Sequence, residues 1–115
     1  MKQDQSKIKQ LARQIKANPG DSFSKFALAL EFQKQGDFEK TRILFENILA
    51  DDPDYIGTYY HLGKLYEMLD RSSDAQKLYK TGIKIASKQK EARTKSELQE
   101  ALYQLEIDIE QEQKG

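Results

Sequence analysis

Apolar residues recur along this chain three or four positions apart, with polar residues between them. This spacing is typical of amphipathic helices, and it predicts six helices and no strands. The stretches between the helices are short. Gly36 favours a helix stop because glycine readily adopts left-handed dihedral angles. The candidate N-caps of the helices that follow such stretches are Asp21, Asp37, and Ser72 or Ser73.

The apolar pattern repeats after 34 residues. The matched pairs are Leu28 and Leu62, Ala29 and Gly63, Phe32 and Tyr66, Thr41 and Ala75, Phe45 and Tyr79, and Pro19 and Pro53. A fixed period of this length indicates stacked units of two helices each. We therefore expect one repeat at residues 22–55 and a second at residues 56–89.

One further helix is predicted on each side of the repeats. Residues 3–17 carry Ile8, Leu11 and Ile15 on one stripe and read as a flanking helix. Residues 90–112 depart from the repeat and read as a capping helix with a charged outer face. Its apolar positions are Leu98, Ala101, Leu102, Leu105 and Ile109. With no long linker, residues 1–115 are expected to form a single domain.

Two clusters of residues resemble the signature of the tetratricopeptide repeat family. In the second repeat they are Tyr59, Leu62, Gly63, Tyr66, Ala75 and Tyr79, and in the first they are Leu28, Ala29, Phe32, Phe45 and Pro53. The chain departs from the signature at Lys25, where a bulky aromatic is usual, at Thr41 in place of alanine, and at Ser87 in place of proline. The resemblance implies an all-α superhelix, a right-handed solenoid of antiparallel helix pairs.

The signature is a packing pattern. The small residues Ala29, Gly63 and Ala75 are expected where the two helices of a repeat cross closely. The aromatic residues Tyr59, Tyr66 and Tyr79 are expected to fill the spaces between neighbouring repeats.

The resemblance also implies a non-catalytic protein that binds a peptide segment or a partner protein in a concave groove. The first helix of each repeat would line this groove. The expected groove residues are Phe23, Phe26, Ala27, Leu30 and Lys34 in the first repeat and Tyr60, His61, Lys64 and Met68 in the second. Aromatic rings beside a cation suit a peptide with an apolar side chain and an acidic group. For Phe23 and Phe26, packing on the N-terminal helix is the other interpretation.

One subgroup of the family holds the C-terminal carboxylates of heat-shock chaperones with a clamp of Lys, Asn and Arg. At the matching positions of the two repeats this chain has Phe26, Leu30 and His61. If the alignment is continued into the segment after the second repeat, Lys95 is the one plausible match. The sequence therefore argues against a chaperone-tail adaptor.

Composition narrows the functional classes further. The chain has 115 residues, with 19 basic and 19 acidic side chains and no net charge, which argues against nucleic-acid and membrane-surface partners. It has no Cys and one His, so thiolate and multi-histidine metal sites are excluded, and no Gly-rich phosphate loop is present. We expect no cofactor and no enzymatic activity. No secretory signal or membrane-spanning run is apparent, so a cytoplasmic protein is expected.

Self-association is the alternative function. Two repeats make a short array, and a homodimer through the groove or the C-terminal helix would extend it. Charge is unevenly distributed, since residues 97–115 contain six acidic and one basic side chain. A third possibility is that the acidic, apolar segment 106–110 enters the groove and inhibits it.

Overall fold

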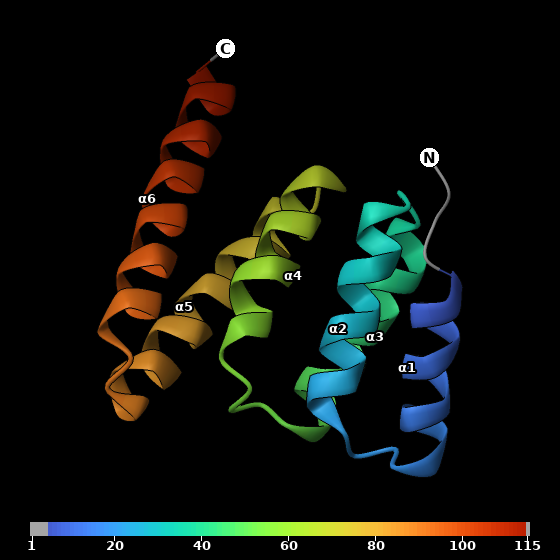
Figure 1. Cartoon of the computed structure of the whole chain (residues 1–115). Coiled ribbons are helices and arrows are strands. Elements are labelled where there is room, and N and C mark those ends of the chain that lie inside the picture. Colours follow the sequence, from blue (N-terminus) through green and yellow to red (C-terminus); the bar gives the residue numbers. More distant parts are fainter. Residues whose placement is uncertain (1–4, 115) are drawn as a thin grey trace. The chain divides into compact units, whose positions relative to one another are not determined.

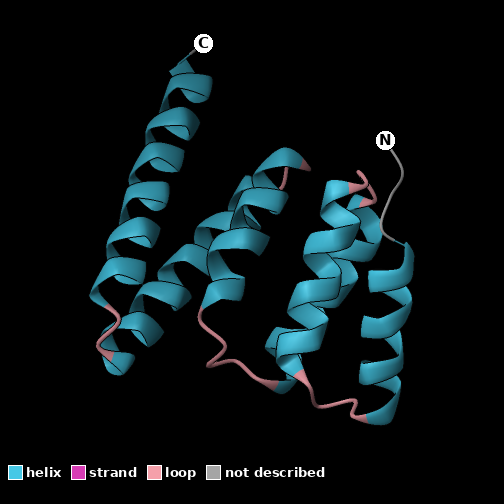
Figure 2. Ribbon diagram, viewed as in Figure 1, coloured by secondary structure: helices cyan, strands magenta, loops and turns pink. Residues whose placement is uncertain are grey.

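The computed structural model describes residues 5–114, which form six α-helices and no strand (Figures 1 and 2). The helices are α1 (Gln5–Ala17), α2 (Ser22–Lys34), α3 (Phe38–Asp51), α4 (Gly57–Met68), α5 (Ser72–Gln89) and α6 (Ala92–Lys114). The predicted number and order of helices are confirmed, although residues 3 and 4 of the expected first helix lie outside the described part. Within residues 5–114, no helix is both long and apolar enough to cross a bilayer.

The chain divides into two compact units, Met1–Tyr55 and Ile56–Gly115. The division falls at the predicted boundary between the two repeats. In unit 1, α2 packs against both α1 and α3. In unit 2, α5 packs against both α4 and α6, and α6 also contacts α4 (Figure 1). Each unit is thus one repeat together with one flanking helix.

The signature positions form the core of each unit. All of them are buried except Phe32, which is half-buried, and Pro53, which is exposed. In α4 and α5 they lie three or four residues apart, so each helix presents one continuous apolar stripe to its partner. The 34-residue period therefore reports the buried face of each helix.

Helices α4 and α5 approach each other so closely that a glycine is required on each. A β-carbon at Gly63 would lie 2.2 Å from Cε1 of Tyr79, and one at Gly82 would lie 2.8 Å from Cβ of Tyr59. The Tyr79 ring therefore fills space between α4 and α5, inside its own repeat. That the signature tyrosines fill the space between neighbouring repeats stays a prediction.

Two residues of unit 1 that depart from the signature, Lys25 and Thr41, are buried with their polar groups paired. Lys25 is only 5% exposed, and its Nζ lies 3.4 Å from Oδ2 of Asp51, so an ion pair takes the place of an aromatic ring. Thr41 is fully buried, and its hydroxyl donates a hydrogen bond of 2.8 Å to the carbonyl oxygen of Asp37. A helical threonine commonly satisfies its hydroxyl in this way, one turn back.

Two of the predicted N-caps are confirmed and one is wrong. The carboxylates of Asp21 and Asp37 accept hydrogen bonds from the backbone N–H groups of Ser24 and Lys40, at 3.0 and 3.2 Å. At the start of α5 the cap is Arg71, with no side-chain cap bond, and Ser72 is already helical. Arg71 stands 34 residues after the N-cap Asp37, so the repeat period alone would have placed the N-cap of α5 correctly. The preference of serine for N-cap positions led to Ser72 or Ser73 instead.

The ends of α2 and α4 are built alike. Gly36 and Asp70, 34 residues apart, both have positive φ angles, of 78° and 63°. In each turn the next N–H reaches back to a helix carbonyl, from Asp37 to Phe32 at 3.0 Å and from Arg71 to Tyr66 at 2.8 Å. A left-handed residue at this point closes the helix and turns the chain toward the next one.

We predict that Asp70→Gly stabilises the protein. Glycine adopts the left-handed conformation without the steric cost that a β-carbon brings, and the expected gain is about 0.5–1 kcal/mol in the free energy of unfolding. Urea unfolding followed by circular dichroism measures it. Gly36→Asp is the reverse exchange at the equivalent turn and is expected to destabilise by a similar amount. Loss of stability in Asp70→Gly would contradict this account of the turn.

We also predict that Gly63→Ala destabilises unit 2 by about 1–3 kcal/mol, because its new methyl group overlaps the buried Tyr79 ring. Gly20→Ala is the control, since a β-carbon there would meet only the Asn18 side-chain oxygen, at 3.6 Å. Thermal or urea unfolding of both variants tests the prediction. Combining Gly63→Ala with Tyr79→Leu should recover part of the loss, and additive effects of the two changes would count against direct overlap.

Candidate functional site

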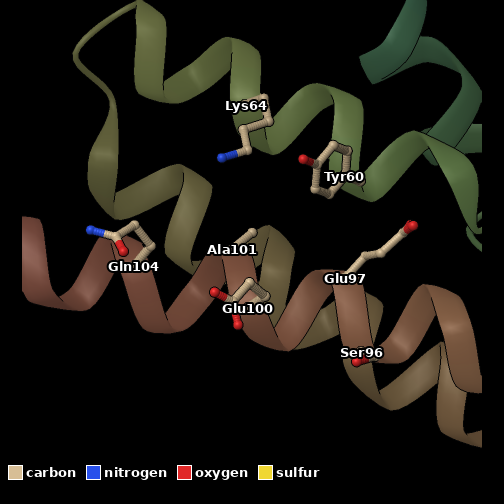
Figure 3. Close-up of a pocket in the computed structure, with 7 residues that line it drawn as sticks. All are labelled: Tyr60, Lys64, Ser96, Glu97, Glu100, Ala101 and Gln104. Carbon is tan, nitrogen blue, oxygen red and sulfur yellow. The ribbon is translucent and has the colours of Figure 1, made fainter.

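Unit 2 contains a hollow between α4 and α6 with a volume of about 460 Å³. We refer to it as the α4–α6 pocket. It is lined by Tyr60, Lys64, Ser96, Glu97, Glu100, Ala101 and Gln104. Figure 3 shows Tyr60 and Lys64 projecting from α4 toward α6, with Glu97 and Gln104 near opposite ends of the pocket and Glu100 and Ala101 between them.

The pocket follows from the way the two helices bury their apolar stripes. On α4, Tyr60 and Lys64 each follow a buried core residue and lie one turn apart, so they share the face beside the core stripe. On α6, Leu98 and Leu105 are buried, and Glu100 lies on the adjoining exposed face. The pocket is thus framed by rigid helices with polar side chains at its rim.

Lys64 is already engaged by groups of its own helix. Its Nζ lies 3.9 Å from Oε2 of Glu67 and 5.7 Å from the centre of the Tyr60 ring. These contacts are one turn away in either direction, as expected for side chains on a common helix face. Part of the positive charge at the pocket is therefore offset by Glu67.

Glu67 connects this rim to the core. The Tyr79 hydroxyl donates a short hydrogen bond to the Glu67 carboxylate, while the Tyr79 ring is fully buried against Gly63. Burial raises the pKa of Tyr79, and the hydrogen bond to Glu67 and the charge of Glu67 raise it further. The tyrosine therefore holds its proton and acts as a fixed donor to Glu67.

The other two predicted groove residues of α4 do not line the pocket. His61 is half-buried, and its ring meets the Tyr60 ring edge-on, with 5.9 Å between ring centres. Burial lowers the pKa of His61, so the imidazole is neutral at pH 7. Met68 is 60% exposed at the end of α4.

The predicted groove residues of unit 1 lie on α2 in different environments. Phe23 is 70% exposed. Phe26 is half-buried and packs with Phe45 of α3 and with Tyr55 of the segment after α3, with ring centres 5.6 and 5.7 Å apart. Its role in the groove stays a prediction.

The remaining residues of the predicted groove in unit 1 are small, apolar or already paired. Ala27 and Leu30 are half-buried. Lys34 is exposed and its Nζ lies 3.2 Å from Oε2 of Glu31, which also pairs with Lys7 at 3.2 Å. Burial raises the pKa of Glu31, but the hydrogen bonds from Lys7 and Lys34 outweigh it and lower the pKa below its usual range.

Sequence reasoning missed the half of the pocket that α6 supplies. The polar side chains of this helix were assigned as a group to an outward face, yet Glu97, Glu100 and Gln104 line the pocket. Their spacing of three and four residues was the available signal, because it defines a single stripe beside Leu98 and Leu105. Lys95 lies instead at a smaller hollow of about 280 Å³ beside the turn between α5 and α6. No group of three or more metal-ligating side chains occurs within residues 5–114.

Comparisons with known proteins agree with this architecture. A family model described as tetratricopeptide repeat matches residues 32–103. A solution structure of a tetratricopeptide repeat domain protein from Salinibacter ruber is 46% identical, covers 77% of this chain and 90% of its own, and has a TM-score of 0.74. A crystal structure of a tetratricopeptide repeat domain protein from the same organism is also 46% identical, covers 75% and 97%, and has a TM-score of 0.73.

A more distant structure shares the fold alone. The TPR2B domain of yeast Sti1, solved as a complex with pHsp70, is 14% identical, covers 88% of this chain and 81% of its own, and has a TM-score of 0.80. No curated protein matches this chain.

We predict that Tyr79→Phe destabilises the protein at pH 7 by about 1.5–3 kcal/mol, because it removes a hydrogen bond to a charged carboxylate. Tyr103→Phe, at a tyrosine that is 64% exposed, is the control and should have little effect. Urea unfolding at pH 7 measures both.

The same pair of variants tests the pH dependence. The folded state raises the pKa of Tyr79 above the ordinary value of 10.0, so its contribution to stability is complete below pH 10. The contribution is lost as the pH rises from there through the folded-state pKa, because the unfolded chain ionises first. Between pH 9 and 11, wild type and Tyr103→Phe should therefore lose more stability than Tyr79→Phe, and equal losses in all three would contradict the prediction.

Proposed function

Since the chain belongs to the tetratricopeptide repeat family, we propose that it is a non-catalytic interaction module that binds a peptide segment or a partner protein. The proposed binding surfaces are the exposed faces of the first helix of each repeat, α2 in unit 1 and α4 in unit 2, and the surface of unit 2 includes the α4–α6 pocket. Proteins of this family are generally interaction modules without catalytic activity. A cytoplasmic location remains a prediction.

The observation that carries the proposal is the α4–α6 pocket itself. It combines an aromatic ring, a cation, two carboxylates and an amide on two packed helices. Both sides of the pocket are helices, so no loop has to be ordered on binding, and such a surface suits a short segment of another chain. The only histidine, His61, lies outside the pocket lining.

The partner is not expected to be a chaperone tail. The positions of the carboxylate clamp hold Phe26, Leu30 and His61, and Phe26 packs against Phe45 and Tyr55. None of these side chains carries a fixed positive charge, whereas recognition of a terminal carboxylate needs cationic donors.

Self-association is the second candidate, favoured by the surface of α6. Tyr103 is 64% exposed on this helix, and Leu102, Ile107 and Ile109 are only half-buried. The segment 106–110 belongs to the continuous helix α6, which runs to Lys114. A homodimer through this helix or through the groove remains a proposal, and sedimentation over a range of concentrations measures it.

We predict that the immobilised chain selects binders from a random-peptide display library, and that Tyr60→Ala weakens their binding at least about tenfold. The matched control is Tyr103→Ala, which removes an exposed ring of α6 outside the pocket lining. Fluorescence anisotropy gives the dissociation constants, and circular dichroism checks that each variant is folded.

Two results would contradict the proposed function. One is that the wild-type chain selects no peptide. The other is that the selected peptides bind the Tyr60→Ala variant and the Tyr103→Ala control with equal affinity. In either case, a mass that rises with concentration would make self-association the leading function.

A further inference from the structure

We propose that the α4–α6 pocket is a binding site for a basic side chain of the partner segment, and for arginine above all. This inference rests on the proposed function and names the chemistry of its ligand. It differs from the sequence-based expectation of an acidic group, which considered the groove residues of the first helix of each repeat and not the helix α6.

The charges at the pocket favour a cation. Helix α6 contributes two carboxylates to the lining, Glu97 and Glu100, whereas α4 contributes a single cation, Lys64. Lys64 already lies near Glu67, with 3.9 Å between Nζ and Oε2. An anionic ligand would have to compete with Glu67 for Lys64 and approach two carboxylates, so its binding would be opposed.

The two pocket carboxylates are accessible to a ligand. Glu100 is exposed and has no ion-pair partner within residues 5–114. Glu97 faces Arg93 across 3.7 Å, but the Arg93 side chain is 93% exposed and such a pair is weak. A bound cation could therefore pair with either carboxylate (Figure 3) without breaking a strong internal contact.

The other lining groups fit a guanidinium better than an ammonium. The planar guanidinium has five N–H donors and pairs with carboxylates in a bidentate manner. Gln104 and Ser96 add side-chain oxygen acceptors, and Tyr60 adds an aromatic ring, whose centre lies 5.7 Å from the Lys64 ammonium. An arginine is less strongly hydrated than a lysine, so it loses less when it enters such a site.

The charge of the surrounding chain acts in the same direction. Residues 97–115 contain six acidic side chains and one basic one. All of the described residues in this range belong to α6, the helix that lines one side of the pocket. A basic segment would therefore be attracted before it makes contact, and its binding should weaken as salt is added.

The direct test is a titration of the ¹⁵N-labelled chain with Nα-acetyl-arginine amide, followed by NMR at low salt. We expect chemical-shift changes concentrated at the pocket residues, with Glu100 and Gln104 among them. Nα-acetyl-aspartate amide is the matched ligand of opposite charge and should leave these signals unmoved. Equal shifts with both ligands, or shifts spread over the whole chain, would overturn the inference.

A pair of charge-matched variants separates the pocket from the general charge of α6. Combined Glu97→Gln and Glu100→Gln should weaken arginine-amide binding at least about tenfold, the loss expected for hydrogen bonds to charged groups. Combined Glu110→Gln and Glu112→Gln removes the same charge from exposed positions of α6 outside the pocket lining and should bind as wild type does. Equal weakening in both double variants would overturn a specific site.

The display experiment distinguishes failure of this inference from failure of the proposed function. The inference would be supported if the selected peptides share an arginine or lysine. Their affinity should then depend on that residue in the wild-type chain and no longer depend on it in the Glu97→Gln, Glu100→Gln variant. Peptides without a basic residue that still depend on Tyr60 would overturn it and leave the proposed function intact. Pocket signals that shift on dilution of the wild-type chain alone would show a second copy at the site and would also overturn it.

Discussion

The absence of a side chain at Gly63 is the constraint on which unit 2 depends. Because a β-carbon there would lie 2.2 Å from the Tyr79 ring, only glycine lets that ring lie where it does between α4 and α5. In this position the Tyr79 hydroxyl reaches Glu67, and Glu67 in turn lies beside Lys64 at the pocket rim. Lys64 lies near the Tyr60 ring. The closest approach in the core therefore positions the groups that face the pocket, and a change in one would disturb the other.

Unit 1 uses the same helical frame for a different surface. Its counterpart of Tyr60 is Phe26, 34 residues earlier, and this ring is occupied by contacts with Phe45 and Tyr55. Where unit 2 has a hollow with a ring, a cation and carboxylates, the corresponding ring of unit 1 packs on other aromatic side chains. A shared repeat thus specifies where the backbone lies, while the side chains beside the buried stripe decide what each repeat can bind.

The sequence predicted the fold well because the residues that recur every 34 positions are mostly apolar side chains buried in the core. Their spacing therefore locates the buried face of each helix. The sequence placed six helices and the caps at Asp21 and Asp37. It failed at Ser72, where a typical capping residue outweighed the period that pointed to Arg71. It also missed that Tyr79 packs within its own repeat, since a spacing identifies a buried face and not the partner across it.

The pocket was only half predictable, and the reason lies in where the repeat ends. Tyr60 and Lys64 follow from the repeat, but α6 departs from it, so Glu97 and Glu100 had no counterpart from which their position could be inferred. Because Glu97 and Glu100 are polar, we expected them to face solvent. A polar side chain at the edge of a buried stripe can equally line a pocket. The non-repeating helix is therefore the element that determines the sign of the charge at the pocket. Within a common fold, we infer, the side chains of such flanking helices can reverse the charge of the ligand that a repeat recognises.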